Sequence, residues 1–222
     1  MRSEGPHAAA GDCELIRGGL IGQPSNTISS LAYCVAGVWI VRRAHRDTDA
    51  RVDPDQQERV AQIGWAAMAA GLGSAAYHGP GRRLGRVAHD GSLAALLAAL
   101  TVAQWRLEGK SARMVLWGST AAGAVPTAAP VALGLNGAAG VTAEVFRIRP
   151  STCRARRERW AAAGVLAVAV PIHLSSRTDR RMCAPRSRWQ GHALWHVLTA
   201  AAVALRADSL LAPSPAVAPF TP

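Results

Sequence analysis

The stretch QGHALWHVL, residues 190–198, places His192 and His196 four residues apart in an apolar run that extends to about residue 207. Residues four apart lie on the same face of a helix, one turn above the other. Ionisable groups are costly in a segment that otherwise suits lipid or a protein core, and they usually mark function there. This pair therefore predicts a helix that carries part of a functional site.

The composition favours a helical membrane protein. Half of the 222 residues are hydrophobic but only 5% are aromatic, and Ala, Val, Leu and Gly supply most of the bulk. Small residues of this kind let helices approach closely in a bilayer. A net charge of +11 could suit nucleic acid, but the arginines gather in short segments between apolar runs, such as VRRAHR (41–46) and RTDRRM (177–182). We therefore expect loops beside membrane spans and no nucleic-acid partner.

Seven apolar stretches predict an all-α bundle of seven transmembrane helices. They cover about 26–44, 60–78, 86–107, 112–126, 128–146, 160–176 and 190–207. Several approach the roughly 20 residues that a helix needs to cross a bilayer. Pro126 and Pro130 predict a turn between the fourth and fifth stretches. The alternative is one broken helix, which would leave six spans and both termini on the same side.

The distribution of charge sets the expected orientation. With the N-terminus outside, the inner segments hold most of the 25 basic residues, although RTDRRM lies on the outer side. This favours an N-out, C-in, multi-pass integral membrane protein. The almost all-arginine basic set and the alanine excess indicate a GC-rich genome, and hence a bacterial cell membrane.

The domain organisation follows from the same pattern. Residues 1–25 contain no apolar core of signal-peptide length, so we expect an extracytoplasmic N-terminal segment and insertion directed by the first span. The helical membrane domain is expected over 26–207. The Pro- and Ala-rich tail, 208–222, is expected to be disordered.

Polar residues within the predicted spans define the candidate site. Ser74 and His78 end the second span, Asp90 opens the third, and His192 and His196 begin the seventh, so all lie at similar depth near the outer side. Three neutral imidazoles with an open fourth position form a catalytic zinc site, which lowers the pKa of a bound water to about 7. We therefore predict the three histidines as zinc ligands. Asp90 would orient the water or accept its proton, and Ser74 would donate a hydrogen bond to an oxyanion.

Other polar residues of the spans have simpler interpretations. We expect His89 and His173 to hydrogen-bond between helices, and Glu144 to lie near the inner interface. A haem ligated by His192 and His196 is disfavoured, because a four-residue spacing places both imidazoles on the same side of the ring. The H-x-x-x-H pair alone is a weak zinc signal, and its combination with Ser74, His78 and Asp90 is stronger.

These motifs resemble the alkaline ceramidase family, within the superfamily of seven-helix membrane hydrolases that includes adiponectin-receptor-like and haemolysin-III-like proteins. The closest stretch is CAPRSRWQGHALWHVLTA (183–200); GLGSAAYH (71–78), HD (89–90), CE (13–14) and NTISS (26–30) are similar to the family's other motifs. The resemblance runs in order from residue 13 to about 205. It implies a zinc-dependent amidase of sphingolipid metabolism, which cleaves the N-acyl bond of ceramide or a related membrane lipid amide to a fatty acid and a sphingoid base.

The resemblance also implies residue roles. By position, His78, His192 and His196 are the zinc ligands, with Asp90 and Ser74 assisting the chemistry. Family members can bridge the positions of Cys13 and Cys183 by a disulfide, which requires an oxidising compartment. Cys34 and Cys153 are then expected to be free thiols.

Two further expectations concern calcium and catalysis. Eukaryotic family members bind calcium near the N-terminus, but here only Glu14 is retained and Gln23 stands where a glutamate is expected. Calcium needs 6 to 8 oxygen ligands, usually with several carboxylates, so we do not expect this site.

The alternative function is a non-enzymatic haemolysin-III-like or adiponectin-receptor-like membrane protein with a structural zinc.

Overall fold

The computed structural model describes residues 9–46, 53–147 and 152–212. This part of the chain is all-helical, which confirms the predicted all-α class. Its elements, in chain order, are α1 (Pro24–Arg46), α2 (Pro54–His78), α3 (Arg83–Trp105), α4 (Gly109–Gly123), α5 (Ala129–Thr142), the short π-helix η1 (Ala143–Arg147), α6 (Cys153–Ser175) and α7 (Gly191–Leu210).

The helices lie close to the predicted stretches. Pro126 and Pro130 fall where a turn was expected, because α4 ends at Gly123 and α5 begins at Ala129 with Pro130 in its first turn. The region therefore forms two helices rather than one broken helix. At the other end, α7 continues to Leu210, past the expected domain boundary at 207. Residues 213–222 of the expected disordered tail lie outside the described residues.

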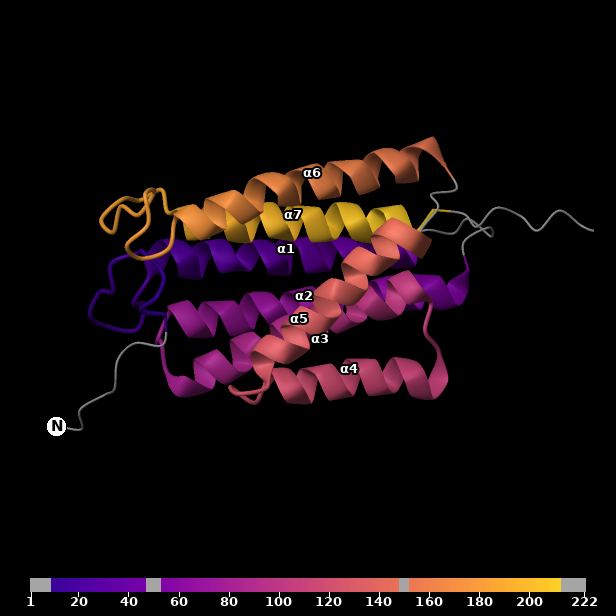
Figure 1. Ribbon diagram of the computed structural model, residues 1–222, viewed down its shortest axis with the longest axis horizontal. Helices are drawn as coiled ribbons and strands as arrows, with labels where there is room; N and C mark the ends of the chain where they lie inside the picture. Colours follow the sequence, from indigo (N-terminus) through magenta and orange to yellow (C-terminus); the bar gives the residue numbers. More distant parts are fainter. Residues whose placement is uncertain (1–8, 47–52, 148–151, 213–222) are drawn as a thin grey trace, which may run out of the picture.

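Most of the helices lie roughly side by side. Helix α1 packs between α2 and α7, α2 packs on α3, and α6 packs on α7. Figure 1 shows α6, α7, α1 and α2 in succession, with α4 beyond them and α5 crossing obliquely over α3. The apolar core forms mainly where α1, α2 and α3 meet, around Tyr33, Ile40, Ile63 and Leu96.

Glycines bring α1 and α2 into backbone contact. A Cβ atom on Gly37 would lie 2.4 Å from the carbonyl oxygen of Gly64, and one on Gly64 would lie 2.7 Å from that of Gly37. On the other face of α2, a Cβ on Gly73 would lie 2.6 Å from the carbonyl oxygen of Ala88 in α3. No side chain fits at these separations, so the small residues set the spacing of the helices.

One described helix meets the length and the apolarity that a membrane span needs. Among the described helices, α3 alone is both long and apolar enough to cross one, and 44% of its apolar window is buried inside the protein. Helices α4 and α5 are short, with 15 and 14 residues. Helices α1 and α6 carry arginines in their last and first turns, respectively, which lowers their mean hydropathy.

Two loops meet at one end of the bundle. The segment before α1 and the loop between α6 and α7 lie next to each other at this end (Figure 1), and Cys13 and Cys183 are joined by a disulfide. The Leu15 amide also donates to the carbonyl oxygen of Pro185 at 2.9 Å. These contacts fix the N-terminal segment beside the start of α7. The other two cysteines are free, with Cys34 half-buried and Cys153 exposed.

Substitution of Gly64 by alanine should destabilise the fold. The added methyl group would meet the Gly37 carbonyl at 2.7 Å and Val41, and such overpacking costs about 1–3 kcal/mol. We expect a lower thermal midpoint for Gly64→Ala than for the native protein. Gly118→Ala in α4 is the control, because no atom lies within 4 Å of a Cβ there. An unchanged midpoint for Gly64→Ala would contradict the close approach of α1 and α2.

Candidate metal centre

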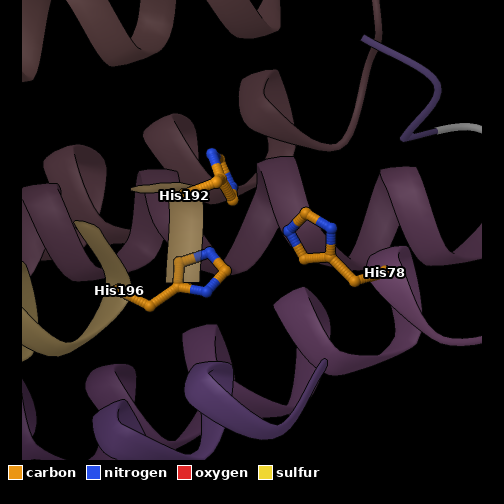
Figure 2. Close-up of side chains that lie close together, drawn as sticks. All are labelled: His78, His192 and His196. Atoms are coloured by element: carbon orange, nitrogen blue, oxygen red, sulfur yellow. The ribbon is translucent and has the colours of Figure 1, made fainter. Parts of the chain in front are cut away.

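Three histidines converge at the end of the bundle where the two loops meet. His78 is the last residue of α2, and His192 and His196 lie in the first turns of α7. One ligand nitrogen from each lies within 4.8 Å of the others, and Figure 2 shows the three rings facing a common space. His78 is fully buried and His196 nearly so. The structure thus brings together the three histidines that the sequence predicted as a set.

The donor set suits a transition metal. Nitrogen atoms at 2.0–2.1 Å from a tetrahedral zinc ion are about 3.4 Å apart. The ring centroids here are 4.6 Å apart for His192 and His196, and 5.0 and 5.1 Å from His78 to each of them. Small ring rotations would therefore bring three nitrogens to bonding distance of one ion. The cluster can hold a metal ion.

Hydrogen bonds from α1 orient the His196 ring. Its Nδ1 lies 2.9 Å from the Ser29 hydroxyl, whose hydrogen is donated to the Asn26 carbonyl oxygen. With that hydrogen assigned to Asn26, the Ser29 oxygen accepts from Nδ1–H, because a hydroxyl has a single hydrogen. The lone pair of His196 is consequently on Nε2. Fixing the tautomer of a ligand through its other ring nitrogen is a common device of metal sites.

A carboxylate from the N-terminal segment faces two of the histidines. Asp12 Oδ1 lies 3.5 Å from His192 Nδ1, and Oδ2 lies 3.9 Å from His78 Nδ1. Burial raises the pKa of Asp12 to about 6, against the opposing effects of Arg177 and His89. Sequence reasoning missed Asp12, which lies outside every helical pattern. The available signal was its neighbour Cys13, since a Cys13–Cys183 bridge brings Asp12 to the start of α7.

Ser74 lies one turn before His78 and is buried against α1. Its hydroxyl oxygen is 3.4 Å from His196 Nε2 and 2.9 Å from the Ser30 hydroxyl. Ser30 donates its own hydrogen to the Asn26 carbonyl oxygen at 2.7 Å, so Ser74 donates to Ser30. The structure therefore brings Ser74 to the histidine cluster, as the spacing of Ser74 and His78 predicted.

Asp90 is placed by contacts within its own helix. Its Oδ1 lies 2.7 Å from His89 Nδ1, and its Oδ2 lies 3.6 Å from Arg86 Nε. The His89 ring stacks on Tyr77 of α2 and lies 6.5 Å from the His78 ring, centroid to centroid. Asp90 is thus tied to a neighbour of the cluster, and Asp12 is the carboxylate that faces His78 and His192.

The remaining polar residues of the helices have varied roles. His89 hydrogen-bonds to Asp90 on its own helix, rather than to another helix. His173 contacts α7 through its ring, which lies 4.7 Å from the Trp195 ring and 5.1 Å from that of His192. Glu144, expected at an interface, binds Arg159 at 2.6 Å and also contacts Arg206. This ion-pair cluster lies in η1, α6 and α7, away from the histidines.

Comparison with known protein families, curated proteins and solved structures identifies no similar protein. No family model matches the chain, and no curated protein or solved structure matches it. The function is therefore argued from the geometry of the site and from the motifs quoted above.

Proposed function

We propose that this protein is a zinc-dependent membrane amidase, which hydrolyses the N-acyl bond of ceramide or a related lipid amide. The supporting observation is the histidine centre itself. Three histidines from two helices place ligand nitrogens within 4.8 Å of one another, and the Ser74 hydroxyl lies 3.4 Å from His196 Nε2. A metal that activates water, with an adjoining hydroxyl that can donate to an oxyanion, is an arrangement that supports amide hydrolysis.

The residues around the centre have separable tasks in this proposal. His78, His192 and His196 would hold zinc, which polarises a carbonyl and activates water when bound. Ser74 would turn its hydroxyl from Ser30 toward the carbonyl oxygen of the substrate and stabilise the charge that develops there. Asp90, whose Oδ1 lies 2.7 Å from His89 Nδ1 beside the His78 ring, would accept the proton of the attacking water, which is then passed to the amine as the C–N bond breaks.

A lipid substrate agrees with the surface of the bundle. Large apolar side chains are exposed on several helices, including Val35 on α1, Leu72 on α2, Trp117 on α4 and Val168 on α6. Exposed apolar surface of this extent suits contact with lipid. We propose that the seven helices span a bacterial membrane with the N-terminus outside and the C-terminus inside. The acyl chain of the substrate would then reach the histidines from the bilayer.

Removal of one ligand should abolish stoichiometric zinc binding. We expect detergent-purified His196→Ala to hold at least about tenfold less zinc than the native protein, measured by inductively coupled plasma mass spectrometry. His173→Ala is the matched control, because His173 contacts the His192 ring but lies outside the ligand set. Native zinc content in His196→Ala would rule out the assigned ligands.

Incubation with a panel of ceramides and other N-acyl lipids should release free fatty acid, detected by mass spectrometry. Asp90→Asn should lower the rate about 10²–10⁴-fold with zinc still bound, because the amide cannot accept a proton. Asp179→Asn, in an exposed loop, should retain activity. Bound zinc without product from any acyl amide would instead favour a haemolysin-III-like protein with a structural metal.

Cysteine labelling should report the orientation. Cys153 is exposed at the start of α6, which the proposal places inside. We expect a membrane-impermeant maleimide to label Cys153 only in permeabilised cells, in a Cys34→Ser background. Leu20→Cys, at a position 82% exposed in the N-terminal segment, should react in intact cells. The reverse pattern would overturn the N-out arrangement.

A further inference from the structure

Gln23 connects the N-terminal segment to the histidine centre. It lies just before α1 and is fully buried. Its side-chain nitrogen lies within hydrogen-bonding distance of three carbonyl oxygens of the N-terminal segment, those of Ala9, Asp12 and Glu14, at 3.0, 3.3 and 3.1 Å, and its two hydrogens are shared among them. Three carbonyl oxygens that converge on one point repel each other unless a donor or a positive charge lies between them. The amide nitrogen of Gln23 fills that position.

The oxygen of the same amide faces the metal centre. Gln23 Oε1 lies 2.8 Å from His78 Nδ1 and accepts from the Asn26 side-chain amide at 3.2 Å. The flipped amide would place Oε1 against the three carbonyl oxygens. The hydrogen-bond network therefore assigns the nitrogen to the carbonyl side and the oxygen to the His78 side. An amide oxygen only accepts, so His78 Nδ1 carries the hydrogen and His78 Nε2 carries the lone pair. Gln23 thereby selects the ligand tautomer of His78.

The backbone reinforces this connection. The Gln23 amide N–H donates to the His78 carbonyl oxygen at 3.0 Å, and the Gly22 N–H donates to that of Gly79 at 2.8 Å. The end of α2 is therefore held against the segment before α1 through both main chain and side chain. A change at the Gln23 carboxamide acts on the His78 ring directly.

The calcium ion that eukaryotic members of the alkaline ceramidase family bind near the N-terminus does not fit these residues. Both oxygens of Glu14 accept backbone N–H groups at the start of α1, from Ser25 and Asn26, at 2.8 Å each. The group that faces the three carbonyl oxygens is the Gln23 NH₂, which cannot ligate a cation. Calcium requires 6 to 8 oxygen ligands, so the donor in the middle of the carbonyls excludes it.

We propose that Gln23 is a positioning residue for His78, and that its amide nitrogen replaces a cation among the carbonyl oxygens of Ala9, Asp12 and Glu14. This inference rests on the proposed metal centre for the role of His78. It makes zinc binding by the native protein independent of calcium. It also predicts that exchanging the Gln23 side-chain NH₂ for an oxygen makes zinc binding depend on calcium.

Gln23→Glu tests the replacement directly. The variant exchanges the NH₂ for an oxygen, so a carboxylate faces the three carbonyls and calcium can supply the missing positive charge. In buffer freed of divalent cations on a chelating resin, we expect its zinc affinity to fall at least about tenfold, measured by competition with a chromophoric zinc chelator. Added calcium chloride should restore the affinity and raise the thermal midpoint. Native protein should show neither response.

Two further variants separate positioning from general damage. Gln23→Met keeps the length of the side chain but neither donates nor accepts at these sites, so its zinc affinity should fall without rescue by calcium. Gln56→Glu buries a carboxylate at a similarly buried glutamine, which hydrogen-bonds to the Ala103 carbonyl far from the histidines. We expect Gln56→Glu to keep the native zinc affinity, and calcium should change neither that affinity nor the thermal midpoint.

The outcomes test the role of Gln23 separately from the proposed zinc amidase function. A calcium-dependent rise in the zinc affinity of the native protein, or native zinc affinity in calcium-free Gln23→Glu, would overturn the role of Gln23. Failure of calcium to restore Gln23→Glu would overturn the replacement of a cation. If the native protein binds no zinc at all, the proposed metal centre fails, and the thermal response of Gln23→Glu to calcium still tests the replacement.

Discussion

Burial of the His78 and His196 rings at one end of the bundle depends on hydrogen bonds to the nitrogens that face away from the centre. An unpaired buried polar group costs about 1–3 kcal/mol. Ser29 accepts from His196 Nδ1, and Gln23 accepts from His78 Nδ1. These partners hold the hydrogens outward and leave the lone pairs inward. The hydrogen bonds that satisfy the buried rings therefore also turn their lone pairs toward the space between the histidines, where a metal ion could bind.

The spacing of α1 and α2 is part of the same arrangement. Gly71 lies one turn before Ser74, and a Cβ there would lie 2.9 Å from the Ser30 carbonyl oxygen and 2.7 Å from Cys34 Sγ. A larger residue would push α1 away and lengthen the 2.9 Å contact between Ser30 and Ser74. The small residues that suggested close helix packing from composition thus also bring the α1 serines within reach of the site.

The sequence predicted those features that follow from helical periodicity. The helices, the turn near Pro126, and the sharing of a face by His192 and His196 depend on local spacing, and the structure has each of them. Asp12 and Gln23 lie in a segment without periodicity, so their partners depend on tertiary contacts that no local pattern reveals. Asp90 was assigned by its position at the start of a span, but position did not reveal its contacts with Arg86 and His89.

The charged side chains at the opposite end lower the mean hydropathy of the helices that carry them. Asp208 of α7 binds Arg43 of α1 at 2.8 Å and Arg154 of α6 at 2.6 Å, so the charges that lower the hydropathy of these helices are paired between helices. A hydropathy average counts each arginine as though it faced its surroundings alone. Paired charges remain costly to desolvate, but each is partly offset by its partner. The mean hydropathy of α1, α6 and α7 therefore includes charges that are paired with one another at the helix ends.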